Sequence, residues 1–355
     1  MARILIKNGR IFDGERFLLA DILTDGERIA KIEEGISEVA DFIFDASDKI
    51  VSPGLVDAHT HLRGISNEEF GIHGEAVSFP FGVTAAADAG GGRGDKALLD
   101  SFMLKGVVFV EVGIRDNRAV FDNLDQRLER YGDRAVGLKV YFDTGVSGVR
   151  DVAPLCEVCD YAHRRGLRVM VHSSNSPVAM AEILKALSAG DILTHAYHGG
   201  KNNAAEDNFD SLISARERGV IIDTGFAGHV HTDFAVLKKA TARGALPDTI
   251  STDITRYSAY TRGGRYGMTM CMNIARTVGM SEIDVFRAVT SSPAKALGKE
   301  SEWGCLMVGR VADIAVFDYA DECFLLTDKA GNSVRGADGY RCVLTVSDGQ
   351  VVYRR

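Results

Sequence analysis

Eight short apolar segments, separated by stretches with helical periodicity, constrain the fold of this 355-residue chain more than any other feature. Each segment is nearly continuous in apolar residues, which is typical of strands buried on both faces of a parallel sheet. Eight strand–helix units within about 240 residues fit a closed (β/α)8 barrel, or TIM barrel. The expected strands, in order, are GLVDAHTHL, VTAAADAG, VVFVEVGI, AVGLKVYF, RVMVHS, ILTHAY, GVIIDTG and TISTDI.

The two ends of the chain carry a different pattern. Turn dipeptides at Asn8-Gly9, Asp13-Gly14 and Asp25-Gly26 separate short strand-like segments near the start. The tail is similar, with GRVADIAVFD, DECFLLTD and YRCVLTVSDGQVVYRR as expected strands. We therefore predict an α/β protein in which residues 1–52 and 301–355 form one small β-sandwich domain and residues 53–300 form the barrel.

The charge balance narrows the range of partners. The chain has 41 Lys and Arg residues against 49 Asp and Glu residues, a net charge of -8. Nucleic acids and anionic membranes both favour basic surfaces, so we expect neither as a partner. No apolar run reaches the roughly 20 residues of a membrane span, and the first residues lack the pattern of a signal peptide. We expect a cytoplasmic protein.

The fourth expected strand contains one residue that does not suit a barrel interior. Lys139 lies among apolar neighbours in AVGLKVYF. Burying an ammonium group costs several kcal/mol unless the charge is paired or neutralised. The side chain could reach solvent along its aliphatic stem, or the amine could have a chemical role.

Other chemically active residues lie at or near the carboxyl ends of the expected strands. In barrels of this kind the catalytic groups stand at that edge. One strand-borne histidine is more often a core residue than a ligand, and a single HxH pair is weak evidence for metal. On a strand, however, residues two apart face the same side and can hold one ion together. The joint pattern favours a metal centre built from His59, His61, Lys139, His172, His195 and Asp253.

This arrangement gives Lys139 a role. A neutral lysine amine can react with CO₂ to form a carbamate, an anion whose two oxygens can bridge two divalent cations. With the carbamate, Asp253 and a bridging hydroxide, two such cations keep about one net positive charge. That charge would polarise a carbonyl oxygen and lower the pKa of the bridging water.

With these residues in place, the chain resembles the amidohydrolase superfamily, specifically its dihydroorotase-like branch with two metal ions. The resemblance covers SPGLVDAHTHLR, Lys139, VMVHSS, DILTHAY, STDI, SSPAKALG and VGRVADIAVFD. It implies that His59, His61 and Asp253 hold one metal ion, that His172 and His195 hold the other, and that carboxylated Lys139 bridges both. It further implies that Asp253 moves the proton of the attacking hydroxide to the leaving group. Nucleobase deaminases with one metal ion lack the bridging lysine.

Within this branch, GDILTHAYHGGK, ISTDI and LTDKAG are similar to segments of proteins often labelled dihydroorotase or adenine deaminase. That group is associated with removing acyl groups from small acylated hydroxy or amino acids. The resemblance therefore implies such a deacylase, with a cyclic-amide hydrolase of the dihydroorotase or hydantoinase type as the alternative. A non-catalytic binding relative is the third possibility, although such proteins usually lose metal ligands. Zinc suits these ligands, and manganese, cobalt and iron are alternatives. The resemblance also implies a homo-oligomer, since relatives are commonly oligomeric.

Four residues are candidates for substrate binding. Arg63 completes an HxHxR motif and could bind a carboxylate, which favours the cyclic-amide alternative. His198 and Lys201 follow the sixth strand. Phe226 stands where the deacylase-like group would have a histidine, and His229 is the candidate to replace it. The second HxH pair, His229 and His231, follows a glycine turn after the seventh strand rather than ending the first strand, so we do not expect it to bind metal.

Three further motifs have simpler explanations. The pair Cys156 and Cys159 lies in a helical pattern, so we expect reduced cysteines rather than half a zinc site or a redox motif. The glycine-rich run at residues 89–96 lacks the phosphate-loop pattern. The segment RYSAYTRGGRYG, after Asp253, is expected to be a loop over the active site.

Overall fold

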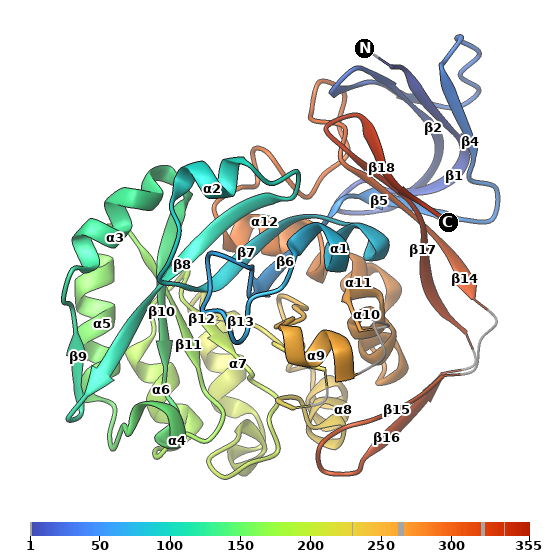
Figure 1. Ribbon diagram of the computed structural model, residues 1–355. Coiled ribbons are helices and arrows are strands. Elements are labelled where there is room, and N and C mark those ends of the chain that lie inside the picture. Colours follow the sequence, from blue (N-terminus) through green and yellow to red (C-terminus); the bar gives the residue numbers. More distant parts are fainter. Residues whose placement is uncertain (1, 229, 262–265, 321–323, 337) are drawn as a thin grey trace.

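The computed structural model describes residues 2–228, 230–261, 266–320, 324–336 and 338–355 (Figure 1). Seven parallel strands follow one another around a barrel in the order of the sequence. They are β6 (Leu55–Thr60), β7 (Val83–Gly91), β8 (Lys105–Arg115), β10 (Ala135–Tyr141), β11 (Arg168–His172), β12 (Ile192–Thr194) and β13 (Ile221–Ile222). A short strand, β9 (Arg118–Val120), pairs antiparallel with the end of β8.

The eighth expected strand, TISTDI, closes the barrel without forming a regular strand. Its first residue, Thr249, bridges Asp223 after β13, and its last, Ile254, bridges Thr60 of β6. Backbone hydrogen bonds from His61 to Ile254 (3.1 Å) and from Asp253 to His59 (2.8 Å) hold its far end. All eight expected positions are therefore present around the ring, and the predicted barrel is confirmed.

Most of the helices follow the strands and cover the outside of the barrel (Figure 1). Asp233 illustrates how they begin, since its carboxylate accepts hydrogen bonds from the first free backbone N–H groups of α8. The helices are α1 (Gly74–Ser78), α2 (Lys96–Asp100), α3 (Leu124–Tyr131), α4 (Thr144–Ser147), α5 (Ala153–His163), α6 (Met180–Ala186), α7 (Asp210–Glu217), α8 (Phe234–Arg243), α9 (Arg256–Thr261), α10 (Met268–Thr277), α11 (Glu282–Ala288) and α12 (Ser291–Ala296), with 3-10 turns at Phe79–Phe81, Gly132–Arg134 and Ala204–Asp207.

Both ends of the chain contribute to one eight-stranded sheet beside the barrel (Figure 1). From the N-terminal side come β1 (Ile4–Phe12), β2 (Phe17–Asp25), β3 (Arg28–Glu33), β4 (Phe42–Asp45) and β5 (Ile50–Pro53); from the C-terminal side come β14 (Ile314–Ala320), β17 (Gly339–Ser347) and β18 (Gln350–Arg354). The central pairing joins β5 to β14 in antiparallel register. The terminal β-strands are thus confirmed, while the domain boundaries at residues 52 and 301 stay a prediction.

One expected strand of the tail lies elsewhere. The segment DECFLLTD contributes β15 (Phe324–Thr327), which pairs with β16 (Ser333–Gly336) as a separate hairpin. The turn of this hairpin reaches the start of α8, where Asp328 accepts a hydrogen bond from the backbone N–H of Phe234 (2.7 Å). The hairpin therefore belongs to the rim of the barrel rather than to the terminal sheet.

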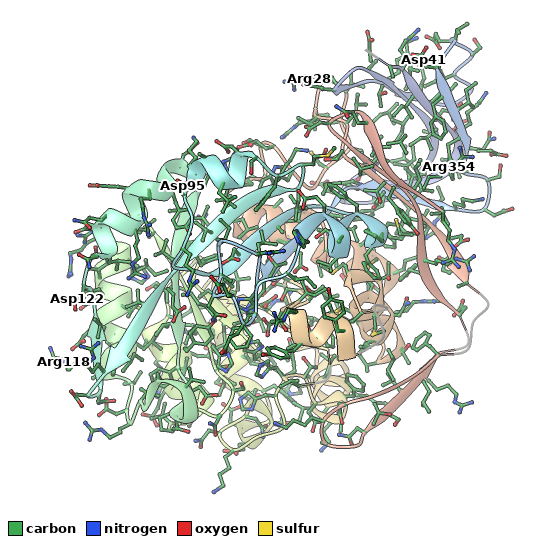
Figure 2. All side chains as sticks on the ribbon, viewed as in Figure 1. Arg28, Asp41, Asp95, Arg118, Asp122 and Arg354 are labelled. Carbon is green, nitrogen blue, oxygen red and sulfur yellow. The ribbon has the colours of Figure 1, made fainter. Side chains whose placement is uncertain are left out.

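Apolar side chains fill the barrel wall and the space between the barrel and the terminal sheet. Phe286 of α11 packs its ring against Phe12, Phe17, Phe317 and Tyr340. Charged side chains such as those of Asp95, Arg118 and Asp122 lie at the outer edge of the molecule (Figure 2). None of the helices in the described parts of the chain combines the length and apolar character needed to cross a bilayer.

Candidate metal centre and active site

A cavity of about 450 Å³ opens at the carboxyl ends of the barrel strands. Five of its lining side chains are imidazole or carboxylate groups that sequence analysis placed at this edge. The lining includes His59, His61, Glu111, Tyr141, Asp143, His172, His195, His231 and Asp253. Residues from the ends of several barrel strands therefore line one common cavity.

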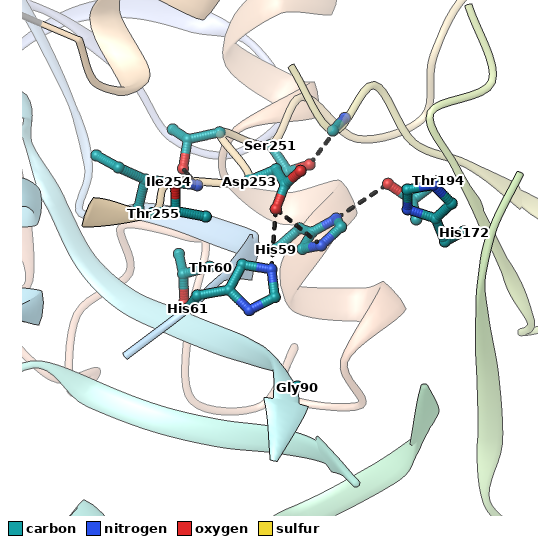
Figure 3. A network of polar contacts seen from close by, with 12 residues as sticks. His59, Thr60, His61, Gly90, His172, Thr194, Ser251, Asp253, Ile254 and Thr255 are labelled. Carbon is teal, nitrogen blue, oxygen red and sulfur yellow. Dashed lines mark hydrogen bonds and ion pairs between the residues drawn. The ribbon is translucent and has the colours of Figure 1, made fainter. Parts of the chain in front are cut away.

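His59 and His61 face the same carboxylate, as their spacing on β6 requires. Their Nε2 atoms lie 3.3 and 3.0 Å from Oδ1 of Asp253 (Figure 3). Asp253 stands at the end of the eighth barrel segment, so the first and last units of the barrel meet here. Ligand atoms of these three buried residues lie within 4.8 Å of one another, a spacing that suits one metal ion.

Buried carboxylates fix the orientation of both rings through hydroxyl groups. The hydroxyl of Thr194 donates to Asp223 (2.7 Å) and lies 3.0 Å from Nδ1 of His59 (Figure 3). Because that hydroxyl proton is committed to Asp223, Nδ1 must carry the hydrogen. The lone pair of the ring then lies on Nε2, toward Asp253, which is the tautomer that binds metal.

His61 is held by the same kind of relay. The hydroxyl of Ser66 lies 3.0 Å from both carboxylate oxygens of Asp88 and 3.0 Å from Nδ1 of His61. Its proton is directed to the carboxylate, so His61 also presents a lone pair on Nε2. Two independent hydroxyl–carboxylate pairs thus prepare both histidines in the same way.

A second group of ligand atoms lies on the other side of Asp253. His172, His195 and His231 bring ring nitrogens within 4.8 Å of one another. The Nε2 atoms of His195 and His231 each lie 3.9 Å from Oδ2 of Asp253, the oxygen that His59 and His61 do not face. Asp253 therefore stands between the two groups with one oxygen toward each.

The rings of this second group are also oriented. Nδ1 of His195 lies 2.7 Å from the carbonyl oxygen of Gly225, which can only accept, so Nε2 carries the lone pair. Ser174 approaches Nε2 of His172 (2.7 Å) and Nδ1 of His231 (3.0 Å). Asp143 lies 3.5 Å from Nε2 of His172. Both of these contacts reach Nε2 of His172, so Nδ1 is the nitrogen left for a metal ion.

Lys139 lies at the base of the site and is completely buried. Its Nζ is 3.2 Å from Nε2 of His59 and 5.4 Å from the centre of the Tyr141 ring. Burial lowers the pKa of Lys139 to about 8, even though Asp253 and Asp223 oppose that shift. Roughly a tenth of the amine is therefore neutral at pH 7, and this is the form that reacts with CO₂.

The histidines are held in their neutral, metal-binding form. Burial lowers the pKa of His172 to about 4 and that of His231 to about 3. Burial also lowers the pKa of His59 and His195 well below the usual value. Metal ions bind the deprotonated ring, so the donor set fits a divalent cation at neutral pH.

Backbone strain marks two of the expected ligands. His195 and Asp253 have φ values of 62° and 47°, in the left-handed region that non-glycine residues seldom adopt. Such strain costs on the order of 1–3 kcal/mol and persists where the surroundings enforce it, often at functional sites. The irregular path of the eighth segment therefore has a local purpose, since it turns Asp253 into the cavity.

The predicted substrate residues lie in different places. Arg63 is exposed, donates to His73 (2.8 Å), and is not among the residues that line this cavity. His198 is buried and lines a neighbouring cavity together with Lys201. His229 lies outside the described residues.

Sequence reasoning missed several members of the site. His231 was not expected at the metal centre, yet its ring lies beside His172 and His195, with ring centres 5.0 and 4.1 Å away. Asp143, two residues after β10, and Glu111, within β8, also line the cavity. Their positions after or within barrel strands were a usable signal, whereas the loop that carries His231 has no regular period.

Cys156 and Cys159 were expected to be reduced, and the cysteines among the described residues, which do not include Cys323, are unpaired. Cys156 is exposed and Cys159 is buried on α5. Cys159 lies near His163 and Asp191 in a group that could geometrically hold an ion. Asp191 is already used structurally, because it accepts from the backbone N–H groups of Val169 and Ser188 (both 2.8 Å).

Comparison with known proteins identifies relatives over the whole chain. The family described as "Amidohydrolase family" matches residues 50–352. The chain is 29% identical over 341 residues to "Deacetylase Atu3266" of Agrobacterium fabrum, covering 89% of this chain and 82% of that protein. It is 26% identical to a "Deacetylase" of Enterococcus faecalis, covering 98% of both.

Solved structures agree with this assignment. A crystal structure of a dihydroorotase superposes with a TM-score of 0.86 at 25% identity, covering 99% of both chains. A crystal structure of an adenine deaminase gives the same TM-score and coverage at 24% identity, which supports the fold.

Proposed function

The chain belongs to the amidohydrolase family and is a metal-dependent hydrolase, and from this membership we propose that it removes the acyl group from a small acylated hydroxy or amino acid. The observation that carries the proposal is the position of Asp253 between two groups of oriented imidazoles. Relatives that are named deacetylases, and that match this chain over most of their length, support the removal of an acyl group.

In this proposal His59, His61 and Asp253 would hold one divalent ion, and His172 and His195 would hold a second. Lys139, as a carbamate, would supply oxygen ligands to both ions, and zinc would suit the nitrogen and oxygen donors. Two ions bound here would polarise the scissile carbonyl and lower the pKa of a water molecule at the centre. His231 is a candidate third nitrogen ligand for the second ion, since its Nε2 faces Asp253 as that of His195 does.

Asp253 has the position needed to move a proton. Its two oxygens face opposite halves of the site, so one would accept the proton of the attacking water while the other stays beside His59 and His61. Delivery of that proton to the leaving oxygen or nitrogen completes the hydrolysis. The relays through Thr194 and Ser66 keep His59 and His61 fixed while Asp253 changes its protonation state.

The test compares three substrate classes with metal-loaded protein. We expect hydrolysis of O-acetyl hydroxy acids or N-acetyl amino acids, and a loss of about 10²–10⁴-fold for Asp253→Asn, the usual contribution of a general acid–base. Turnover of dihydroorotate or hydantoins alone would replace the deacylase with a cyclic-amide hydrolase. Metal content is measured on the same samples, so that a loss of ions is distinguished from a loss of proton transfer.

A further inference from the structure

A second cavity, of about 980 Å³, adjoins the metal centre. The two cavities share Asp143, Val230 and His231 as lining residues, so they meet beside the second group of histidines. The far wall of the second cavity comes from the loop after β12 and from the turn of the β15–β16 hairpin. These segments contribute Lys201 and Lys329.

From this arrangement we propose that the second cavity binds the carboxylate of the substrate, through Lys201, Lys329 and His198, while the acyl group occupies the metal centre. This inference rests on the proposed function and names the residues that would select acids over neutral acyl compounds. Lys329 is the new element, because it lies in the C-terminal hairpin, far from the barrel loops in sequence.

The two lysines are the uncompensated charges of this cavity. Both are exposed, and neither has an ion pair or hydrogen bond with any other residue in the described part of the chain. The cavity also has two carboxylates, Asp143 and Asp233, and in each of them local groups donate hydrogen bonds to one oxygen, Oδ1. Asp143 accepts from the Gly145 N–H (2.7 Å) and from Asn175 (2.8 Å).

Asp233 is engaged in the same manner. Its carboxylate accepts from the backbone N–H groups of Ala235 (2.9 Å) and Val236 (3.0 Å) and from Asn332 (3.2 Å). An anion entering the cavity therefore meets two ammonium groups without an ion-pair partner among the described residues, and two carboxylates whose Oδ1 atoms are already hydrogen-bonded.

His198 supplies a neutral donor beside the lysines. The N–H of Gly200 donates to its Nδ1 (3.2 Å), so the hydrogen of the neutral ring lies on Nε2. This Nε2 is buried and has no hydrogen-bond partner among the described residues. A buried N–H without an acceptor is costly, and a ligand oxygen would satisfy it.

The hairpin turn that carries Lys329 is held in place. Asp328 accepts from the backbone N–H groups of Phe234 (2.7 Å) and Asn332 (2.8 Å). Asn332 in turn donates to Asp233, at the start of α8. Lys329 is thus attached to a turn that is itself fixed to the barrel, and this keeps its backbone in the lining of the second cavity.

The experiment measures the preference for a charged substrate over a neutral one. The probes are two matched pairs: N-acetylalanine with N-acetylalaninamide, and O-acetyllactate with O-acetyllactamide. Wild-type protein is expected to prefer the carboxylate of each pair in kcat/KM. In Lys201→Met and Lys329→Met this preference should fall about tenfold, through KM, as the loss of one charge-assisted hydrogen bond predicts. Values for the neutral amides should change little.

Lys239→Met is the matched control, because Lys239 is an exposed lysine on α8 that lines neither cavity. Its preference should equal that of wild type. The proposal is overturned if wild type turns over both members of a pair equally, or if the two cavity variants keep the wild-type preference.

A binding measurement separates this proposal from the proposed function. If metal-loaded wild type hydrolyses none of the probes, the deacylase function fails, and calorimetric titration of metal-free protein with lactate then decides the subsite alone. Weaker lactate binding in Lys201→Met and Lys329→Met than in Lys239→Met supports the carboxylate subsite. Absent binding in wild type, or equal binding in all variants, refutes it.

Discussion

The burial of Lys139 leads to a prediction about CO₂ and pH. With a pKa of about 8, roughly a tenth of the amine is neutral at pH 7 and about half at pH 8, whereas an exposed lysine is neutral in roughly one molecule in 2,500 at pH 7. If carboxylation of the neutral amine limits assembly, the initial rate of CO₂-dependent metal uptake should rise about fivefold between pH 7 and pH 8.

The assay starts from metal-free protein, incubated with zinc at constant CO₂ pressure, and counts the ions retained per chain after desalting. Lys139→Met is the control, because methionine fills similar space without an amine. Wild type should approach two ions in the presence of CO₂, and the variant should retain fewer at every pH. The reasoning is refuted if uptake by wild type does not depend on CO₂, or if the variant retains as many ions as wild type.

Three further substitutions test the architecture around the site. Thr194→Val removes the hydroxyl between His59 and Asp223, and metal affinity measured by competition with a chelator should fall about 10- to 100-fold; an unchanged affinity would mean that the relay does not orient the ring. Gly225→Ala places a methyl group within 2.5 Å of Nδ1 of His195, at a φ of +51°, so the purified protein should hold less metal than wild type, and full occupancy would contradict the geometry. Phe286→Ala empties the space among four aromatic rings and should lower the free energy of unfolding in urea by about 3–5 kcal/mol; a loss below about 1 kcal/mol would show that the space collapses.

Regular elements could be predicted from the sequence because their periods are local. Apolar runs located all eight barrel positions, and the spacing of His59 and His61 placed both rings on one face of β6. The eighth segment was correctly placed along the chain, but its irregular form was not foreseen, because the left-handed backbone of Asp253 is stabilised by contacts with residues far away in sequence.

The positions of side chains on loops could not be predicted, because a loop path depends on contacts between distant residues. Ala227 and Gly228 both have positive φ values and turn the chain before His231, so its position depends on a loop path without a repeating pattern. Arg63 follows the HxH pair, yet its side chain turns outward to His73. The sequence of the hairpin that carries Lys329 predicts one more strand of the terminal sheet. Contacts of Asp328 with α8 hold the hairpin at the barrel rim instead.

The buried carboxylates have a role in the barrel interior, because they orient the histidines of the site. Burial raises the pKa of Asp88 to about 6, in spite of hydrogen bonds that favour its charged form, and burial also raises the pKa of Asp223. Neither residue faces the metal position directly, and each acts through one hydroxyl on one histidine. In the metal-free protein these buried ionisable groups lower the stability of the fold, because Lys139 has His59 rather than a carboxylate as its nearest polar contact. Cations at the centre would reverse that cost, since they stabilise every carboxylate around them. The polar core is therefore arranged for the metal-bound state, and the stability of the barrel and the assembly of its active site depend on the same few residues.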